Sequence, residues 1–563
     1  MLIRAFLVVC AAAVATAWYV ALPPRATVAS PEDAAATVRG AIHVHTTRSD
    51  GTGSVEDVAA AAAQAGLDFV VFTGHGDGTR DPLPPQYRSG VLCIDGVEVS
   101  TREGHVVAIG LPKTPYALGG EARDVLDDIG RMGGMAIAAH PGSVKPGLQW
   151  TDWAAPVDGI EWLNADSEWR DESAWSLVRA LLAYPARPTE SVAGLLDRPD
   201  PVLLRWDELL RTRNVVAVAA SDAHARLGFR SLGEPYDNGA SLHLPAYERV
   251  FRTFSNVLSG VTLTGEAASD AALVIAALRA GHVYSRVDAI GAAGTLAFQA
   301  TSGDVTAAAG DVLPSRGPVA MTVELASAPP ARIALLKDGQ EIASGSDARL
   351  DYATDLSAGV YRVEVSVPGA PGRPPVPWIV SNPIYVGRDG RPRAVAAPRP
   401  VSASESQYSN GAADRWRVET SPGSRAAIDV GKTSDGTHLA LRYALGGSTA
   451  ESAYAGFVMS SGPTLPQFDR VTFTANADQP MRLSVQLRIP GGEQGERWQR
   501  SVFLDEMPRA LTVYFDDLRA AGATRTERPP LDAVDSVLFV VDTVNTPLGG
   551  SGRIWIDEVK YGR

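Results

Sequence analysis

The chain has 563 residues, which is too long for one ordinary domain and predicts two to four. Hydrophobic residues make up 45% and charged residues 20%, a composition typical of folded domains rather than of disordered chains. The formal net charge is −13 and no run of lysine or arginine occurs, which argues against a protein that holds nucleic acid through a basic surface.

The first segment of the chain is apolar. No charged residue occurs between Arg4 and Arg25, and small residues at Ala15 and Ala17 resemble a cleavage site. Residues 1–25 are therefore expected to be either a secretory signal peptide or a membrane anchor. Both alternatives predict an exported protein, periplasmic or extracellular, whose contact with a membrane is made only by this segment.

Cysteine is too rare in this chain to form a disulfide scaffold. Cys10 lies in the apolar first segment, which leaves Cys93 alone in the remainder. Cys93 stands in the apolar run Val91–Ile94, where a small core residue is the simplest interpretation. Stability must therefore come from hydrophobic cores.

Residues 38–295 alternate short apolar runs with helical stretches, the pattern of βα units. In the first unit, Ser54 is a candidate N-cap and Gly66 a candidate C-terminal cap of an alanine-rich helix. Further elements are expected as strands over 37–44, 67–72, 135–139 and 215–220, a helix over 121–132, and a helical insertion over 162–213.

The pattern changes near residue 300, where apolar and polar residues begin to alternate. Residues 300–388 are predicted to form a small antiparallel sandwich of immunoglobulin-like type, with Asp338-Gly339 as a hairpin turn. Residues 389–410 are rich in proline, alanine and serine and are expected to be a linker. Short strands then resume, so residues 411–563 are predicted to form a second sandwich of jelly-roll type.

Histidine and carboxylate residues recur where the predicted strands of the first domain begin or end. Six of the nine histidines of the chain fall between residues 43 and 224. Because the carboxyl ends of parallel barrel strands meet at one mouth, these side chains are expected to converge there. Imidazole and carboxylate together suit Zn²⁺, Mn²⁺ or Fe²⁺. The candidate metal ligands are His43, His45, Asp50, His75, Glu98, His105, His140, Asp222 and His224.

The motifs His-x-His-Thr-x-x-Ser-Asp-Gly from His43, Ala-His-Pro-Gly around His140 and Asp-x-His at Asp222 resemble the polymerase-and-histidinol-phosphatase (PHP) superfamily of metallohydrolases. The long insertion and the sandwich after the first domain are most similar to its carbaryl-hydrolase-like branch. The resemblance implies a distorted (β/α)7 barrel that holds two or three divalent ions. It assigns the first ion to His43, His45, Glu98 and Asp222, the second to Glu98, His105 and His140, and the third to Asp50, His75 and His224.

One position departs from the family pattern. The family usually has aspartate before the lone histidine of its second motif, where this chain has Gly74 before His75. A carboxylate there would orient a ligand, so its loss predicts a weak or absent third ion unless Asp77 takes its place.

The resemblance and the ligand chemistry together predict a hydrolase that uses a metal-bridging hydroxide. A phosphoesterase acting on mono- or diesters is the main hypothesis, and a carboxylic ester or carbamate hydrolase is the alternative. The substrate is expected to be a small-molecule or glycan-linked ester. Glu98, Asp222 and Arg102 are the candidate catalytic residues. Arg48, Arg80, Arg102 and Arg226 either bind an anion or form a solvated barrel rim.

A different class of function is suggested by the last predicted domain, which resembles galactose-binding-like carbohydrate modules. Trp416, Trp498 and Trp555 either stack on sugar rings or belong to the sandwich core. The alternative is therefore a non-catalytic, exported carbohydrate-binding protein. Asn164 also has two interpretations, a substrate contact or a turn cap.

Overall fold

The computed structural model describes most of the chain. The described residues are 37–228, 241–291, 294–314, 317–355, 358–388, 399–409, 413–433, 436–447, 452–491 and 495–563, with residues 16, 18, 19, 22 and 23. The predicted signal peptide or anchor, residues 1–25, lies outside this set apart from those five positions. Among the described residues, no helix combines the length and the apolar character needed to cross a bilayer.

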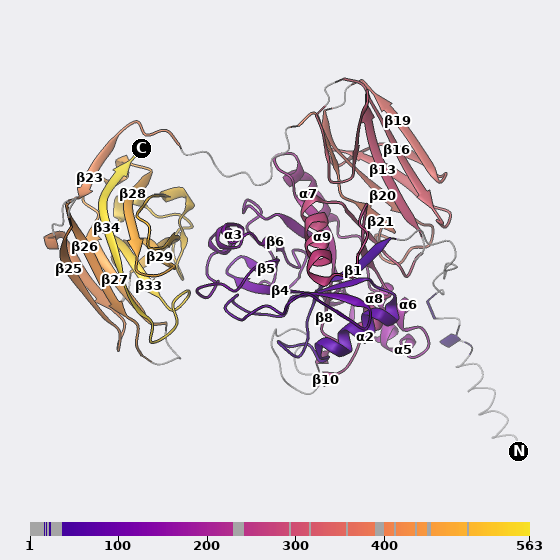
Figure 1. Cartoon of the computed structure of the whole chain (residues 1–563), viewed down its shortest axis with the longest axis horizontal. Coiled ribbons are helices and arrows are strands. Elements are labelled where there is room, and N and C mark those ends of the chain that lie inside the picture. The colour runs from indigo at the N-terminus through magenta and orange to yellow at the C-terminus, as the bar shows by residue number, and fades with distance from the viewer. Residues whose placement is uncertain are drawn as a thin grey trace, which may run out of the picture.

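The first domain is built around a closed sheet of strands (Figure 1). Each strand pairs with the next, and the last pairs again with the first, which closes the barrel. The seven strands are β1 (Val38–Val44), β2 (Phe69–Phe72), β4 (Val91–Thr101), β5 (Gly104–Ile109), β6 (Met135–Ala138), β7 (Gly159–Asn164) and β8 (Val216–Ala223), and β3 (Gln86–Arg88) pairs with β4 outside the ring.

The barrel differs from the regular alternation implied by a (β/α)7 arrangement. Strand β5 runs antiparallel to both β4 and β6. Only residues 102 and 103 separate β4 from β5, and a parallel pairing needs a crossover of about a dozen residues. Helices connect β1 to β2 through α2 (Val55–Ala65), and β5 to β6 through α3 (Ala122–Arg131), but none links β6 to β7 in this described stretch.

Local sequence signals explain helix α2, whose predicted caps are confirmed. The Ser54 hydroxyl accepts a hydrogen bond from the Asp57 backbone N–H, and the Asp57 carboxylate accepts one from the Ser54 N–H. Gly66 ends the helix with φ of 73°, a left-handed conformation that glycine adopts without strain. The helix ends there, and β2 enters the barrel core. Cys93 is buried in the core, as predicted.

The predicted helical insertion lies between β7 and β8. It consists of four helices, α4 (Ala165–Arg170), α5 (Ala174–Ala183), α6 (Pro188–Ala193) and α7 (Asp200–Leu210). Trp206 of α7 is fully buried against the barrel and donates to the Val215 carbonyl at 2.9 Å. After β8 the chain continues through β9 (Leu227–Gly228), β10 (Ser241–Leu242) and α8 (Tyr247–Phe251).

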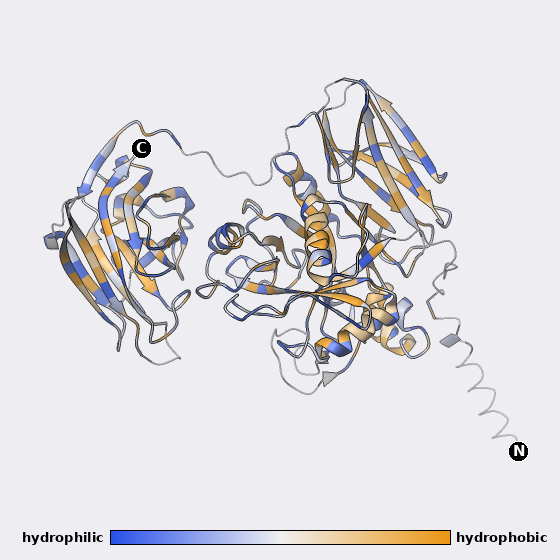
Figure 2. Cartoon of the chain, in the orientation of Figure 1, coloured by the Kyte–Doolittle hydropathy of each residue, from blue (hydrophilic) through white to orange (hydrophobic). Residues whose placement is uncertain are grey.

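The barrel sheet extends into the second domain instead of ending at a boundary. Strand β11 (Ser255–Leu258) pairs with β1, then β12 (Val283–Arg286) pairs with β11, and β21 (Ile379–Ser381) pairs with β12. Helix α9 (Ala267–Ala280) connects β11 to β12, and Figure 2 shows it mainly in hydrophobic colours. The sheet is therefore shared by both domains, although Thr295, at the predicted boundary, begins a strand of a separate four-stranded sheet.

The second domain is a sandwich of two β layers, as expected for residues 300–388. One layer is β13 (Thr295–Ser302), β14 (Val305–Ala308), β16 (Val319–Ala326) and β19 (Arg349–Thr354). The other, continuous with the barrel sheet, contains β15 (Val312–Leu313), β17 (Arg332–Lys337), β18 (Gln340–Gly345), β20 (Gly359–Ser366), β21 and β22 (Ile384–Val386). Asp338 and Gly339 form the predicted turn, with φ of 50° and 84°. Hydrophilic and hydrophobic colours alternate along β13, β16 and β19 in Figure 2.

The last domain, from residue 404 onward, contains two six-stranded antiparallel sheets. One sheet has β23 (Ser404–Tyr408), β25 (Arg425–Thr433), β26 (Gly436–Ala444), β28 (Arg470–Ala477), β31 (Arg509–Tyr514) and β34 (Ser551–Gly562). The other has β24 (Trp416–Thr420), β27 (Tyr454–Ser460), β29 (Met481–Ile489), β30 (Glu496–Leu504), β32 (Arg519–Ala520) and β33 (Ser536–Asp542).

The predicted linker over 389–410 is wrong in its second half. Strand β23 lies within it and pairs with β34. Its sequence, Ser-Glu-Ser-Gln-Tyr, carries no hydrophobic alternation, and Tyr408 is its one large apolar anchor. An edge strand of this kind is not visible in the hydrophobic pattern. Residues 389–398 and 410 lie outside the described residues.

The last domain contacts helix α3 of the barrel domain through polar side chains. Arg482 of β29 is buried and lies 2.7 Å from an Asp128 oxygen. Gln499 and Ser501 of β30 donate to Glu121 and Asp124 at 3.0 and 2.6 Å. These contacts bury charge in pairs, and they fix which face of the last domain meets the barrel domain.

Candidate metal centre

The structure brings all nine predicted ligand side chains into one continuous cluster at one end of the barrel. They come from β1, β4, β5 and β8 and from the segments that directly follow β1, β2, β6 and β8. Contacts of 3.6 Å or less between ring nitrogens and carboxylate oxygens connect them. The convergence predicted from strand ends is therefore present, whereas ion binding itself stays a prediction.

The innermost part of the cluster is a group of four atoms. The Nε2 atoms of His43 and His45 lie 3.1 Å apart. Each is 3.2 Å from Glu98 Oε2, and they lie 3.3 and 3.2 Å from Asp222 Oδ1. A tetrahedral ion with bonds of about 2.0–2.1 Å has ligand atoms separated by about 3.3 Å. The spacing of His43, His45 and Glu98 therefore fits one divalent ion, and Asp222 Oδ1 lies close to the same two imidazole nitrogens.

Glu98 connects this group to a second one through its other oxygen. Glu98 Oε1 lies 2.7 Å from His105 Nδ1 and 2.8 Å from His140 Nε2. One buried carboxylate thus faces two imidazoles with Oε1, and with Oε2 it faces three, since His75 Nδ1 also lies 3.1 Å from that oxygen. A bridging carboxylate of this kind is suited to hold two ions close together.

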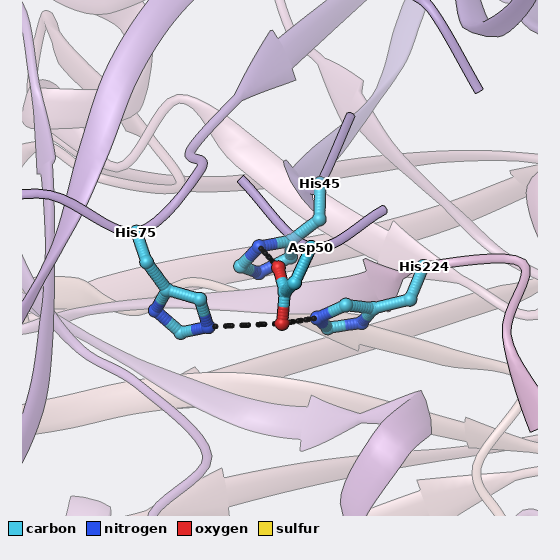
Figure 3. Close-up of side chains that lie close together, drawn as sticks. All are labelled: His45, Asp50, His75 and His224. Atoms are coloured by element: carbon cyan, nitrogen blue, oxygen red, sulfur yellow. Dashed lines mark ion pairs between the residues drawn. The ribbon is translucent and has the colours of Figure 1, made fainter. Parts of the chain in front are cut away.

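A third group surrounds Asp50 (Figure 3). Asp50 Oδ1 lies 3.1 Å from His45 Nδ1, and Asp50 Oδ2 lies 3.5 and 3.3 Å from the Nε2 atoms of His75 and His224. The side chains of Asp50, His75 and His224 are 11%, 12% and 20% exposed, against 4% or less for the innermost group. The third group is the part of the cluster open to ligands.

Three of the candidate ligands have an unusual backbone. His43, His140 and Asp222 have φ of 65°, 31° and 41°, a region that costs a non-glycine residue about 1–3 kcal/mol. Strand β1 also shifts register between Ala41 and Val44 against β2. A regular strand would place His43 and His45 on the same face. The register shift interrupts this regular alternation, and both rings reach the cluster.

Carbonyl and carboxylate partners fix how the rings present their nitrogens. His43 Nδ1 lies 2.6 Å from Glu161 Oε1, and His140 Nδ1 donates to the Leu148 carbonyl at 2.9 Å. His224 Nδ1 donates to the Asp222 carbonyl at 2.9 Å. Because Nδ1 is the donor in each ring, the Nε2 lone pair is available to the cluster.

Glu161 is a functional residue that the sequence reasoning did not identify. It is 1% exposed, and besides His43 it accepts from the His140 backbone N–H at 2.7 Å and from Asn164 Nδ2 at 2.8 Å. The available signal was a single charged residue inside the apolar strand Gly159–Asn164. A buried carboxylate in a strand requires partners, and here these are two candidate ligands.

Asn164 acts as a cap, which is one of its two predicted roles, and also contacts Asp222. Its side-chain oxygen accepts from the Ser167 N–H at the start of α4, as a cap does. Its Nδ2 also lies 3.3 Å from Asp222 Oδ2. Asn164 thus positions the candidate ligand Asp222 without belonging to the ligand set itself.

The electrostatics of the cluster are dominated by mutual attraction. Burial by itself would raise the pKa of Glu98, but His75, His43 and His105 hold it well below its usual value. The pKa of Asp222 is lowered in the same way by His43, His45 and His224, against its burial. The pKa values of His43 and His45 are raised well above their usual value by the surrounding carboxylates, although burial opposes this.

Two buried oxygens test whether a cation fits. Within the described part of the chain, Glu98 Oε2 and Asp50 Oδ1 are buried and accept no well-formed hydrogen bond. Imidazole nitrogens nevertheless lie 3.1–3.2 Å away from them. A buried anion without a hydrogen bond is costly, and a cation between the oxygen and the imidazoles would remove that cost. The donor set therefore fits divalent ions.

Gly74, which precedes His75, lies against Ser49. A Cβ atom at Gly74 would lie 2.8 Å from Ser49 Oγ, so a larger side chain would require Ser49 to move. Asp77 accepts from the Thr79 N–H and hydroxyl at 3.0 and 2.6 Å. Ser49 Oγ lies 3.4 Å from His45 Nδ1, which also has Asp50 Oδ1 at 3.1 Å.

The four candidate arginines are placed differently from one another. Arg102 pairs with Glu121 at 2.7 Å and contacts the Ala520 carbonyl, so it lies at the contact with the last domain and is not brought to the cluster. Arg48 binds both oxygens of Asp95, and Arg80 donates to the Arg48 carbonyl. Arg226 lines the cavity beside the cluster. The catalytic assignment of Arg102 therefore has no support in its position.

Comparisons with known proteins give no family for this chain. No family model and no curated protein matches it. Among solved structures, a family 11 carbohydrate-binding module from Clostridium thermocellum, in complex with a β-1,3-1,4-mixed-linked tetrasaccharide, is 16% identical, with a TM-score of 0.24 over 28% of this chain and 94% of that one. A family 30 carbohydrate-binding module of a cellulosomal cellulase from the same organism is 8% identical, with a TM-score of 0.22 over 28% and 96%. The mannan-recognising module TmCBM27 is 14% identical, with a TM-score of 0.21 over 30% and 99%.

Proposed function

We propose that this protein is an exported hydrolase that depends on divalent metal ions and cleaves ester bonds, with phosphomono- or diesters as the first substrate class. The observation that carries the proposal is Glu98, whose buried oxygens face two and three imidazoles at 2.7–3.2 Å. The proposal includes the PHP resemblance, with the closed seven-stranded barrel as a variant of the distorted (β/α)7 arrangement.

Three sets of residues would hold the ions. His43, His45, Glu98 and Asp222 form the inner set, Glu98, His105 and His140 the middle set, and Asp50, His75 and His224 the outer set. Ions bound there would lower the pKa of water and attract the charge that develops on an ester oxygen. Zn²⁺, Mn²⁺ and Fe²⁺ are the candidates, because imidazole and carboxylate suit each of them.

The residues of the chain prepare this site before any substrate arrives. Glu98 and Asp222 remain ionised at neutral pH, because their pKa values lie well below the usual range. Glu161 and the Leu148 carbonyl orient His43 and His140. In the net reaction the oxygen of water bonds to phosphorus, the phosphorus–oxygen bond to the alcohol breaks, and the alcohol oxygen takes a proton.

Elemental analysis and a substrate panel test the proposal together. The full chain is loaded with Mn²⁺ or Zn²⁺ and assayed on nitrophenyl phosphate, bis-nitrophenyl phosphate, naphthyl acetate and a naphthyl carbamate, before and after chelation. We expect at least two bound ions and phosphoester turnover that chelation abolishes. Bound metal without turnover on any ester would refute the enzyme and leave a binding protein.

Carboxylic esters or carbamates are the second candidate substrate class for the same site. The observation in their favour is the cavity beside the cluster, of about 450 Å³, whose far wall is made of leucine and valine side chains. Faster turnover of the naphthyl substrates than of the phosphates in the panel would replace the main hypothesis by this one.

Carbohydrate binding is a separate proposal for the last domain. Trp416 and Trp498 are buried in its core, 7% and 0% exposed, so they are not available to stack on sugars. Trp555 of β34 lies between the buried Ile554 and Ile556 and is half-buried, with the Arg553 guanidinium 5.8 Å from its ring. Trp555→Ala is expected to reduce retention on glycan affinity gels and leave ester turnover unchanged, while unchanged retention would refute this contact.

A further inference from the structure

The cavity of about 450 Å³ has two chemically different ends. One end is formed by candidate ligands, among them Asp50, Glu98 and Asp222. An apolar part of its lining belongs to the helical insertion and is formed by Leu177, Val178, Leu181, Val192, Leu195 and Leu196. The volume lies in the range of pockets for small organic ligands. The cavity therefore suits a molecule with one polar end and one apolar end.

Helix α5 provides most of this apolar wall, and its composition is unusual for a surface helix. Its sequence, Ala-Trp-Ser-Leu-Val-Arg-Ala-Leu-Leu-Ala, has one charged residue, and Ala183 is its only buried residue. Val178 and Leu181 line the cavity and are still 46% and 49% exposed. Apolar side chains that line an open cavity and remain half exposed are available to a ligand.

Several polar side chains of this wall already have partners within the protein, although Arg170 Nη1 has no hydrogen-bond partner among the residues that the structure describes. The Tyr184 hydroxyl accepts from the Ala246 N–H at 2.9 Å, and Ser191 Oγ donates to the Arg187 carbonyl at 2.7 Å. Asp166 pairs with Arg170 and accepts from Trp169 Nε1. A sugar or nucleotide would need hydrogen-bond partners here, whereas an apolar group needs none.

The shape of the wall indicates an elongated ligand. Lining residues occur along α5 from Ala174 to Tyr184, a span of roughly 15 Å at the rise of an α-helix. An alkyl or acyl chain can follow this wall while its ester group lies at the ligand cluster. A compact polar substrate would leave most of the wall in contact with water.

We propose that the substrates are amphiphilic esters, with the ester group at the metal cluster and an extended alkyl or acyl chain along α5 and α6. This inference rests on the proposed function and adds the class of substrate to it. Burial of the substrate's methylene groups against this wall is favourable. The value of kcat/KM is therefore expected to increase with the length of the alkyl or acyl chain until the wall is covered.

A series of dissolved nitrophenyl alkanoates and alkyl nitrophenyl phosphates, with two to ten carbons, tests the inference on the metal-loaded full chain. We expect kcat/KM to rise up to about fourfold for each added methylene, the factor that burial of one methylene gives. Leu181→Asp is expected to abolish this dependence, because a charge on this wall opposes burial of the alkyl or acyl chain. Leu204→Asp is the matched control, because Leu204 is 63% exposed on α7 and does not line the cavity.

The outcomes separate this inference from the proposed function. Turnover that is equal for all chain lengths, or equal dependence in Leu181→Asp and Leu204→Asp, would overturn the inference and retain the hydrolase. Calorimetric binding of octyl phosphate that Leu181→Asp removes, without turnover of any ester, would refute the hydrolase and support the apolar site. A higher rate on the ten-carbon ester in phosphatidylcholine vesicles than on the dissolved ester would identify a lipid surface as the source of the amphiphile.

Discussion

The inner and outer halves of the ligand cluster use the same side-chain types in different surroundings. The inner set of His43, His45, Glu98 and Asp222 is at most 4% exposed and its nearest atoms are 3.1–3.3 Å apart. In the outer set, Asp50 and His75 lie in segments after strands, His224 follows β8, and the side chains are 11–20% exposed toward the cavity. Buried carboxylates and imidazoles are costly without an ion. The inner set is therefore suited to retain metal, and the outer set to meet substrate.

The largest effect is expected from Asp222→Asn, which removes an inner charge and leaves the volume unchanged. We expect turnover to fall more than about a hundredfold, which exceeds the effect of changing a residue that only orients a ligand. The circular dichroism spectrum should be unchanged, because the fold is retained. Steady-state kinetics and elemental analysis measure the loss of activity and of one ion. Asp351→Asn, on the second domain, is the control. Near-normal turnover in Asp222→Asn would show that the inner set is assigned incorrectly.

Glu161→Gln is expected to weaken the inner set without removing a ligand. The charge that orients His43 is lost, so metal affinity should fall about 10- to 100-fold. Titration with Zn²⁺ or Mn²⁺ measures this change. Excess metal should restore turnover in Glu161→Gln but not in Asp222→Asn. If excess metal fails to rescue Glu161→Gln, Glu161 has a role beyond orienting His43.

The pH dependence of metal binding gives a third test of the inner set. The raised pKa values of His43 and His45 mean that the metal-free protein holds protons there. Their ion pairs stabilise that form below the ordinary pKa of about 6.5, and this stabilisation is lost as pH rises through the raised values. Metal must displace these protons, so affinity should fall about tenfold per proton for each unit of decreasing pH. Calorimetry in two buffers with different ionisation enthalpies measures the release, and absence of release would contradict it.

The smallest effect is expected in the outer set, with Asp50→Asn. This substitution removes the carboxylate between His75 and His224 and is expected to reduce the bound ions by one. Turnover should fall by about tenfold or less, because the inner set is intact. Elemental analysis and kinetics measured on the same sample test this. A loss as large as that of Asp222→Asn would remove the distinction between the two sets.

The convergence of the nine candidate ligands could be predicted because each stands beside a recognisable strand, and the ends of barrel strands meet at one mouth. The sequence did not predict Glu161, whose role depends on β7 lying between β6 and β8 in the closed barrel, where Glu161 reaches His43. Arg102 follows Glu98 closely in sequence, but β4 continues to Thr101 and carries Arg102 to α3. Hydrophobic alternation predicted the sandwich strands and missed β23, where most side chains are polar.

The pairing of β12 with β21 has a consequence for shortened versions of the protein. A chain ended at residue 295 would lose β21 and leave the backbone of Tyr284–Arg286 without its partner. An unpaired edge of this kind recruits strands from other molecules, so the isolated barrel is expected to aggregate. Residues 379–381 thus act as a built-in cover that protects the barrel domain from self-association.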